Sequence, residues 1–434
     1  MVEIQCFVEG QQYSELDVPK EFIKKAYFNR TSNGLLTAKI TGISHMVEQD
    51  EIRTFLFLPK GFHSSQIKDE NEKKELAKLV YKTLKKYSNT TKLEEFEQSW
   101  LGKKDANVID FSLIEWLLRD WQNFGFYRIQ NRSYELNGKG KIDWRRTIKK
   151  TFPIFGTDDI IYPNLWTFKN NLSSDKLITE IHKSIIKDIL DKYGWLYDIQ
   201  KVHFIEDNKI SDEQKVIFLK RKLNEVNAGR DIILLQNLIT YLTRKESDSE
   251  HLTLATPYFY SIYEKILQEQ FGHDRQLNKL VPKPYWILSG DSNKKYSRQI
   301  PDILIKTNNN DLVILDAKYY SVTEINEDSE ILDASISRFP GWEAVVKQLY
   351  YNGSMEGIYN NIENIFIMPE NISNKFRYIG YTGVANREDQ FGIVLAYSIN
   401  IKKILVDYLS NEKNLSLITD IISDAKIRKS QIIT

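Results

Sequence analysis

The chain has 434 residues, of which 41% are hydrophobic and 27% are charged, a balance typical of folded globular proteins and not of disordered ones. This length predicts two or three domains. The formal net charge of +1 neither indicates nor excludes binding to nucleic acid, so any phosphate contact must come from local patches of basic residues.

The cysteine and histidine content narrows the possible chemistry. Cys6 is the single cysteine, which excludes an internal disulfide and a cysteine-based zinc site. The six histidines are scattered, and no two have the spacing of metal ligands. No apolar run has the length of a transmembrane helix, and Met1–Gln11 lacks the features of a signal peptide. We therefore expect a cytoplasmic protein.

The first part of the chain carries signals for strands and then for helices. Alternating apolar residues predict strands around 34–36 and at 53–58, and the charged segment 66–87 favours a helix. Asp110 is a candidate N-cap for a helix over 110–121. Asn137-Gly138 is a turn signal between runs at 126–129 and 141–144, which predicts a hairpin. This helix-then-hairpin order also allows a winged helix.

The remaining elements predict the domain organisation. Helical patterns at 173–193 and 212–244 are followed by a new domain that begins near Glu246. There we expect, in order, a helix (256–270), strands (285–319), a helix (341–352), two strands (364–368 and 392–399) and a helix (402–409). Mixed strands and helices in this order suggest a sheet flanked by helices. We predict a multidomain α/β chain with an N-terminal α+β domain (1–155), a helical connecting region (156–245) and a C-terminal domain (246–434).

The most informative stretch lies between residues 300 and 318, where two β-rich runs enclose an Asn-rich turn. If this turn centres on Asn309, Asp302 and Asp316 lie opposite one another across the hairpin, with Cβ atoms roughly 5 Å apart. Asp316 and Lys318 are two residues apart on one strand, so their side chains point the same way. The sequence therefore predicts two carboxylates and an amine on one face.

These residue types suit metal-dependent hydrolysis. Neighbouring carboxylates repel one another and raise each other's pKa, and a divalent cation removes this repulsion. Mg²⁺ prefers oxygen ligands, so we expect Asp302, Asp316 and the backbone carbonyl of Ala317 to bind one or two Mg²⁺ ions. Lys318 would position or deprotonate the attacking water and stabilise charge on the phosphate. The alternative is an ordinary hairpin whose charges form an ion pair.

Two predicted helices supply further candidates. Glu264 flanks an apolar stripe on the helix before the hairpin, from which a carboxylate reaches the metal; the alternative is a solvated surface acid. Gln348 lies on the helix after the hairpin and would bind phosphate or orient Lys318, with Lys347 and Tyr351 as further DNA or partner contacts. The alternative for this group is the polar side of an amphipathic helix.

Pro301-Asp302 followed by Asp316-Ala317-Lys318 resembles the PD-(D/E)xK signature of restriction-endonuclease-like nucleases. With Glu264 before it and Gln348 after it, the pattern looks like the RecB-type branch of that superfamily. This branch has a tyrosine four residues after the glutamine, where the present chain has Asn352. The resemblance implies that the C-terminal domain is a PD-(D/E)xK mixed sheet flanked by helices.

Most of the chain resembles the LlaJI family of restriction endonucleases, which is related to McrC, the nuclease subunit of McrBC systems. Beyond the hairpin, the resemblance lies in residues 138–148 and in Lys283-Pro284-Tyr285-Trp286. It implies a McrB-like AAA+ GTPase as the partner that recognises and translocates double-stranded DNA. The chain itself has no G-x-x-x-x-G-K-[ST] loop, so we expect no nucleotide hydrolysis by it.

Six basic residues and one acid, Asp143, lie between positions 139 and 150. The basic residues are Lys139, Lys141, Arg145, Arg146, Lys149 and Lys150. One interpretation is a phosphate-binding patch. A second, implied by the resemblance, is a surface that enters the partner GTPase and supplies Arg145 or Arg146 in trans. A third is a solvated hairpin end.

The leading hypothesis is thus a Mg²⁺-dependent DNA endonuclease, the catalytic subunit of a restriction system that defends against phage. The alternatives are a non-hydrolytic adaptor that stimulates a partner GTPase, and a stand-alone RecB-like exonuclease. The intact set of Asp302, Asp316 and Lys318 argues against the adaptor, because an inactive site has no need of it.

Overall fold

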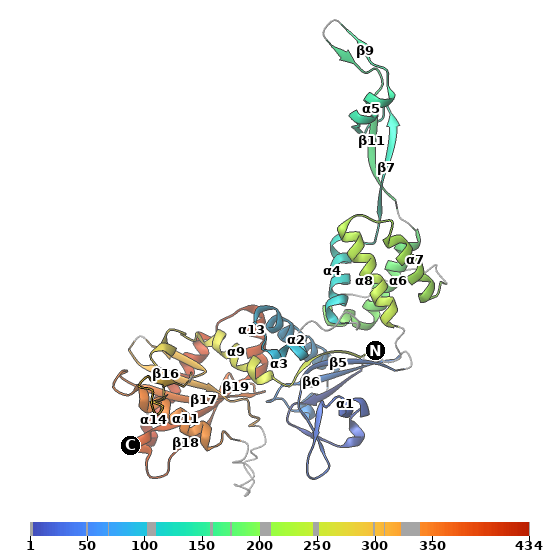
Figure 1. The fold of residues 1–434 in the computed structure, drawn as a ribbon. Coiled ribbons are helices and arrows are strands. Elements are labelled where there is room, and N and C mark those ends of the chain that lie inside the picture. Colours follow the sequence, from blue (N-terminus) through green and yellow to red (C-terminus); the bar gives the residue numbers. More distant parts are fainter. Residues whose placement is uncertain are drawn as a thin grey trace. The chain divides into compact units, whose positions relative to one another are not determined.

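The computed structural model describes residues 3–48, 51–67, 69–101, 110–156, 159–173, 176–199, 210–245, 251–297, 300–307, 309–322 and 339–433. The chain forms two compact units (Figure 1). Unit 1 comprises Met1–Lys104 and Thr253–Thr434, and unit 2 comprises Asp105–Leu252. Unit 2 is therefore an insertion into unit 1. This division differs from the three consecutive domains predicted from the sequence, because the first hundred residues group with the C-terminal part.

The N-terminal part of unit 1 contains two small sheets. The four-stranded sheet has the order β1 (Ile4–Val8), β6 (Glu51–Leu58), β5 (Thr41–Glu48) and β12 (His251–Thr256). The three-stranded sheet has the order β2 (Gln12–Tyr13), β4 (Leu36–Ala38) and β3 (Phe28–Arg30). β1 and β6 are parallel, whereas β5 and β6 are antiparallel. Phe55 and Phe57, two residues apart on β6, face one core with Phe7 and Phe22. The strand predicted at 53–58 is confirmed.

Helices complete this part of unit 1. They are η1 (Glu15–Asp17), α1 (Lys20–Lys24), η2 (Ser64–Gln66), α2 (Glu70–Thr90) and α3 (Glu95–Leu101). The Asp69 side chain accepts a hydrogen bond from the backbone N–H of Glu72 and caps α2. The helix predicted at 66–87 therefore exists, but it begins after this cap.

The C-terminal part of unit 1 is built on a mixed sheet, as the sequence predicted, and this sheet has five strands. Its order is β15 (Ile303–Lys306), β16 (Leu312–Ala317), β17 (Ile362–Glu370), β19 (Ile393–Asn400) and β18 (Phe376–Gly383). β16, β17 and β19 run parallel to one another, and the two edge strands are antiparallel to their neighbours. β18 was not predicted. The hairpin of β13 (Tyr285–Trp286) and β14 (Lys295–Tyr296) forms a separate two-stranded sheet.

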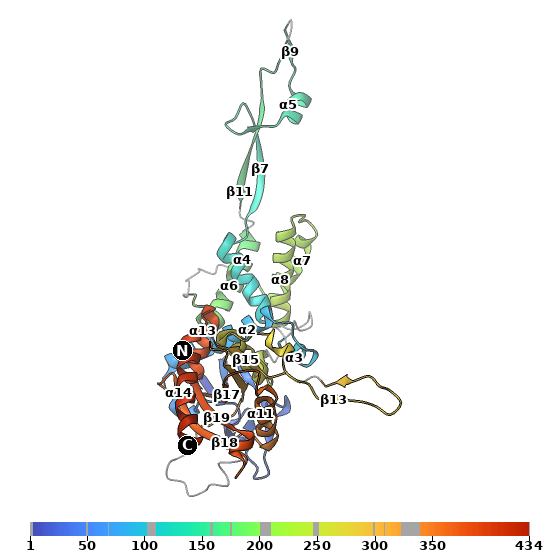
Figure 2. The same cartoon turned by 90° about the vertical axis from the view of Figure 1, so that its left-hand side faces the viewer.

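Helices cover both faces of this sheet. They are α9 (Phe259–Phe271), η4 (Leu277–Lys279), α11 (Trp342–Met355), α12 (Glu388–Phe391), α13 (Ile401–Ser410) and α14 (Leu415–Ile433). Phe366 of β17 packs in one cluster with Leu349 of α11. Tyr397 lies beside Ile367, on the opposite face from Phe366, and its hydroxyl donates to Asp424 of α14 over 2.8 Å. α11 and α14 thus lie on opposite sides of the sheet (Figure 2).

Gly61 marks a close approach between the two parts of unit 1. It follows β6, has a φ of +96°, and its carbonyl accepts a hydrogen bond from the N–H of Asn371 over 2.8 Å. A Cβ atom at this position would lie 2.7 Å from the carbonyl oxygen of Pro369, at the end of β17. Only glycine combines this φ with so close a backbone contact.

The described residues of unit 2 include four helices of 12 or more residues. They are α4 (Phe111–Phe124), α6 (Lys176–Tyr193), α7 (Asp212–Leu223) and α8 (Gly229–Lys245), with η3 (Gly194–Tyr197) after α6. The Asp110 side chain accepts a hydrogen bond from the N–H of Leu113 over 2.8 Å, so the predicted N-cap of α4 is confirmed. Arg230 of α8 makes two hydrogen bonds to Asp120 of α4, which is 4% exposed. Among the helices of the described ranges, none has both the length and the apolar character needed to cross a membrane.

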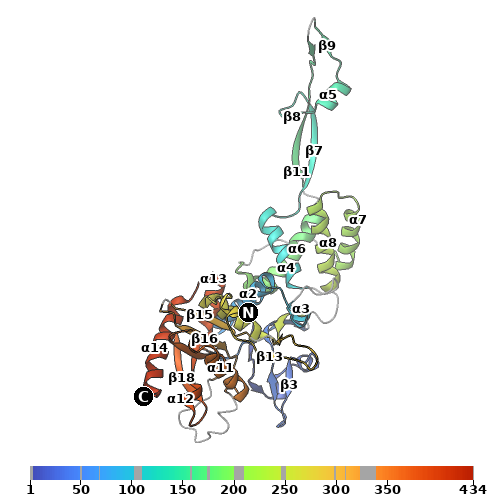
Figure 3. The same cartoon turned by 60° about the vertical axis from the view of Figure 1, so that its left-hand side comes forward.

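A long antiparallel β-ribbon also belongs to unit 2 (Figure 3). Its elements are β7 (Ile129–Leu136), β11 (Trp166–Ser173), β8 (Lys141–Ile142), α5 (Trp144–Lys150) and the hairpin of β9 (Ile154–Phe155) and β10 (Ile160–Ile161). β11 lies between β7 and β8 and pairs with both. The hairpin predicted across Asn137-Gly138 is therefore wrong, and with it the winged-helix alternative. Asn137 does form a turn, with a φ of +53°, but its side chain and N–H bind residues 164–165.

Candidate active site

The β15–β16 hairpin has the register that the sequence predicted. Ile303 pairs with Leu315 and Leu304 with Ile314, so the same register continued by one residue places Asp302 opposite Asp316. The turn is closed by hydrogen bonds between Thr307 and the residues that follow it. The two aspartates lie at the end of the hairpin that is farthest from this turn.

These side chains belong to the face of the sheet that α11 covers. Ile314, two residues before Asp316, packs in one cluster with Tyr351 and Met355 of α11. Because side chains alternate along a strand, Asp316 lies on the same face as Ile314. Lys318 continues this alternation, and its Nζ atom lies 5.7 Å from the centre of the Phe366 ring on that face.

The structure brings the two aspartates and the lysine together. The Asp302 Oδ2 atom accepts a hydrogen bond from the backbone N–H of Ala317 over 3.0 Å. The Nζ atom of Lys318 lies 2.6 Å from Oδ2 of Asp316, and these side chains are 17% and 4% exposed. The Lys318 N–H donates to the carbonyl of Ile367, which extends the β16–β17 pairing past Ala317 and fixes the backbone of the lysine. Backbone hydrogen bonds at the end of β16 therefore hold the residues of the site in place.

The electrostatics of the pair are unfavourable without a cation. Burial, followed by the neighbouring Asp316 carboxylate, raises the pKa of Asp302 to about 8. Lys347 opposes this shift. A protein that carries such a carboxylate gains from any ligand that supplies positive charge between the two aspartates.

We expect replacement of Asp302 by asparagine to flatten the pH dependence of stability in the metal-free protein. Between pH 4 and about 8, folded Asp302 retains a proton that the unfolded chain releases, so stability falls as pH rises through this window. In the variant, the decrease in the free energy of unfolding across this pH window should be smaller by about 1–3 kcal/mol than in the wild type. Thermal or urea unfolding in EDTA measures this free energy. Asp389→Asn, at an exposed position of α12, is the matched control. If the free energy of unfolding of Asp302→Asn depends on pH as in the wild type, ionisation of Asp302 does not destabilise the folded protein.

Glu264 of α9 lies near the pair but does not join it. Burial and the Asp316 charge raise the pKa of Glu264, whereas Lys347 and Lys318 lower it, so the group senses the site electrostatically. Its Oε1 atom accepts a hydrogen bond from Gln268, whose side chain also donates to the backbone carbonyl of Asp302. Within the described parts of the chain, no three His, Cys, Asp or Glu side chains come close enough to bind a metal ion together. The three-carboxylate set that we predicted with Glu264 is therefore not formed in this arrangement.

Gln268 is a residue that the sequence analysis missed. It bridges Glu264 and the Asp302 backbone, and its position four residues after Glu264 places both on one side of α9. This spacing of four residues from Glu264 is the feature of the sequence that could have identified Gln268.

The residues of α11 divide between the site and the core. Gln348 is 1% exposed, and its amide donates to the carbonyl of Ile314 over 3.3 Å, so it holds the backbone of β16. Lys347 acts electrostatically on both Asp302 and Glu264. Tyr351 is 1% exposed in the core cluster, which argues against the contact with DNA or a partner that we predicted for it.

The basic residues predicted at 139–150 belong to unit 2, whereas the β15–β16 hairpin belongs to unit 1. Lys139, Lys141 and Arg145 are exposed. The guanidinium of Arg146 stacks on Tyr134, with its Cζ atom 3.5 Å from the ring centre, and Lys150 lies 5.4 Å from the Trp166 ring. Arg146 therefore packs against the ribbon, whereas Arg145 presents its side chain to solvent.

The chain belongs to the LlaJI restriction endonuclease family, whose sequence profile matches residues 46–388 and thus most of its length. It is also similar to the Type II restriction enzyme BsuMI component YdjA of Bacillus subtilis, with 28% identity over 334 residues. This similarity covers 72% of the present chain and 69% of the relative. The family match includes the insertion that forms unit 2 and the hairpin with both aspartates.

Proposed function

We propose that this protein is the DNA-cleaving subunit of a restriction system and hydrolyses phosphodiester bonds with Mg²⁺ at Asp302, Asp316 and Lys318. The observation that carries this proposal is the pairing register, which sets two carboxylates and an amine on one face at one end of the hairpin. Membership of a restriction endonuclease family supports the same reaction. The arrangement agrees with a PD-(D/E)xK nuclease, and we assign the C-terminal part of unit 1 to that class.

The residues present fit Mg²⁺. Two carboxylates at adjacent positions, one with a pKa raised to about 8, form a site whose repulsion a divalent cation would relieve. Mg²⁺ often binds through one or two carboxylates, with water and substrate phosphate as the remaining ligands, so a third acidic residue is not required. Asp302 and Asp316 would hold the ion, with the Ala317 carbonyl as a further oxygen ligand. The ion supplies Lewis acidity toward the phosphate.

The protein groups have separate tasks in this proposal. Lys318, whose ammonium is held beside Asp316, donates hydrogen bonds to the attacked phosphate and stabilises the negative charge that develops there. Asp316 orients this ammonium, while the Ala317 N–H fixes one oxygen of Asp302. Gln348 positions the strand through its bond to Ile314 and does not touch substrate. Glu264 and Lys347 adjust the local potential.

The surface beside the site has features that favour DNA as the substrate. The β13–β14 hairpin, which precedes Asp302 in the chain, projects from unit 1 (Figure 2). Its exposed aromatic side chains include Trp286 at 71% and Tyr296 at 62%. Lys294 lies 4.2 Å from the ring centre of Tyr285. The Tyr350 hydroxyl of α11 donates to the carbonyl of Pro282 and joins the hairpin base to the helix that covers the site. Exposed aromatic and basic groups suit contacts with bases and phosphates.

The test of this proposal is cleavage of plasmid DNA by the full chain, with Mg²⁺ or EDTA, and with or without GTP and the other components of the restriction system. We expect cleavage only with Mg²⁺. Equal cleavage in EDTA would contradict the metal-dependent reaction.

We further propose that the ribbon of unit 2 contacts a McrB-like GTPase subunit. The region around α5 is rich in exposed apolar residues, including Trp144 at 55%, Phe152 at 92% and Phe155 at 73%. Arg145 stands among them with an exposed guanidinium, which favours it over the packed Arg146 as a group supplied in trans. The relative's description as a restriction enzyme component also suits a protein that works with others.

Replacement of Arg145 by alanine should lower the GTPase rate of the partner in the complex at least about tenfold, because an arginine supplied in trans stabilises transition-state charge. Phosphate release by the mixed subunits measures this rate. Lys149→Ala, another exposed cation of α5, is the control. Equal loss in both variants would indicate a general electrostatic contribution, and no loss in either would remove Arg145 from the GTPase mechanism.

A further inference from the structure

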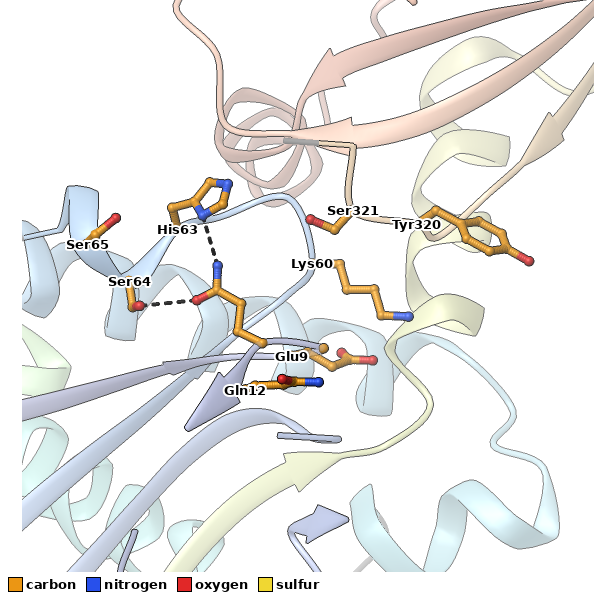
Figure 4. Close-up of a pocket in the computed structure, with 10 residues that line it drawn as sticks. Glu9, Gln12, Lys60, His63, Ser64, Ser65, Tyr320 and Ser321 are labelled. Carbon is orange, nitrogen blue, oxygen red and sulfur yellow. Dashed lines mark hydrogen bonds between the residues drawn. The ribbon is translucent and has the colours of Figure 1, made fainter. Parts of the chain in front are cut away.

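A polar pocket of about 530 Å³ lies next to the catalytic strand in unit 1 (Figure 4). Its walls come from the end of β1, from the segment after β6 and from the residues that follow β16. Glu9, Gln12, Lys60 and Tyr320 are among its lining residues. Its volume lies within the range of small-molecule sites, so one nucleotide can enter it.

The pocket and the proposed active site share one stretch of chain. Tyr320 follows Lys318 by two residues, so their Cα atoms are at most about 7 Å apart. The hydroxyl of Tyr319 accepts a hydrogen bond from the N–H of Lys60 over 2.8 Å, and the Lys60 ammonium donates to the Tyr319 carbonyl over 3.3 Å. These bonds fix the pocket wall to the end of the catalytic strand.

Glu9 presents an unused hydrogen-bond acceptor in this pocket. Its side chain is buried, with 7% of the residue exposed. The Oε2 atom accepts hydrogen bonds from the hydroxyls of Thr41 over 2.7 Å and Tyr319 over 2.9 Å. Within the described residues, no donor bonds to the Oε1 atom. The Oε1 atom is therefore accessible from the pocket, where it can accept a hydrogen bond from a ligand in place of water.

The other polar groups define the class of ligand. The Lys60 ammonium supplies a positive charge, and the exposed Gln12 amide supplies both a donor and an acceptor. A simple anion would meet the Glu9 carboxyl, and a simple cation would meet Lys60. A nucleotide satisfies both, because an amino group of its base can donate to a carboxylate while its phosphate lies near an ammonium.

We propose that this pocket binds one nucleotide of the substrate strand, and that the exocyclic amino group of its cytosine or adenine base donates to Glu9 Oε1. The proposal rests on the nuclease function proposed above for its DNA source. Carboxylates accept from such amino groups in known modes of base reading, and enzymes that act on DNA can accommodate a base outside the duplex stack.

The first experiment measures binding of free dCMP, dAMP and dTMP to the full chain by NMR or calorimetry. We expect dCMP and dAMP to bind at least about tenfold more tightly than dTMP, which has no exocyclic amino group. Glu9→Gln, which retains an acceptor for Tyr319, should reduce this preference to less than about twofold. Gln12→Ala, which leaves the buried bonds of Glu9 intact, should weaken all three nucleotides. Equal binding of the three by the wild type, or no binding, would overturn the proposal.

The second experiment distinguishes a nucleotide in DNA from a free nucleotide, with short single-stranded oligo(dC) and oligo(dT). A preference for oligo(dC) that Glu9→Gln removes would support the substrate strand as the source. If free dCMP binds but oligo(dC) is not preferred over oligo(dT), the bound nucleotide does not come from the substrate strand. Lys318→Ala separates the two proposals, because it should lose DNA cleavage but retain nucleotide binding. Retained cleavage together with normal nucleotide binding would refute the nuclease site and leave the pocket assignment intact.

Discussion

Replacement of Lys318 by alanine is expected to reduce the rate of DNA cleavage by about 10³-fold, and replacement of Asp316 by alanine should have an effect at least as large. The structure holds the lysine beside the aspartate pair by an ion pair, with 2.6 Å between Nζ of Lys318 and Oδ2 of Asp316. Loss of a positioned group that stabilises transition-state charge or transfers a proton typically costs two to four powers of ten. Single-turnover cleavage of plasmid DNA with Mg²⁺, GTP and the other subunits measures the rate.

The control for this experiment lies on the same hairpin. Lys306 is exposed at the end of β15 next to the turn, at the opposite end of the hairpin from Asp302. Lys306→Ala should cleave DNA at nearly the wild-type rate. Thermal unfolding of each variant shows whether it is folded. If folded Lys318→Ala cleaves DNA at the wild-type rate, the lysine has no part in the reaction. If Asp316→Ala is active as well, our assignment of the catalytic site is wrong.

Substitution of Gly61 by alanine is expected to destabilise unit 1 by roughly 2–4 kcal/mol, because it combines an unfavourable φ with an overpacked contact. The added Cβ would lie 2.7 Å from the carbonyl oxygen of Pro369, and a φ of +96° is unfavourable for alanine. Backbone atoms cannot rotate away as a flexible side chain can, so β6 and β17 must separate. Chemical denaturation with a tryptophan or circular-dichroism signal measures the change.

Gly353→Ala provides the matched comparison. Gly353 lies in α11, and a Cβ atom there would have no neighbour within 4 Å. Alanine has the higher helix propensity, so this variant should be unchanged or more stable by up to about 1 kcal/mol. Equal stability of Gly61→Ala and the wild type would show that the two sheets can move apart without loss.

The register of the β15–β16 hairpin was more predictable than the domain organisation, because the residues of the hairpin are close in sequence. Strand alternation and the length of the turn are local properties, and together they determine that Asp302 meets Asp316. The same local reasoning failed at residues 126–144. There β7 and β8 each pair with β11, whose paired residues lie between 25 and 44 positions away in the sequence. A local turn signal contains no information on so distant a partner.

Burial explains the other differences. Tyr351 and Tyr350 are adjacent on α11, yet one is 1% and the other 39% exposed, because the helix turns only one of them toward the core. The sequence pattern did not show which side faced the sheet. β18 was missed because this edge strand is half-buried, contains Gly380 and Gly383, and has an irregular register between Tyr378 and Gly380. Its residues therefore lack the regular alternation that marks β16.

The discontinuity of unit 1 has a consequence for biosynthesis. Its four-stranded sheet takes its edge strand, β12, from residues 251–256, and both candidate catalytic aspartates come later still. A ribosome therefore delivers all of unit 2 before unit 1 can be completed, since domains fold as whole units while the chain emerges. Nascent or prematurely terminated chains that stop before Asp302 have a ribbon and helices but no pair of carboxylates. Under the proposed function, the order of elements thus delays completion of the cleavage site until the surface proposed to receive the partner subunit has been synthesised.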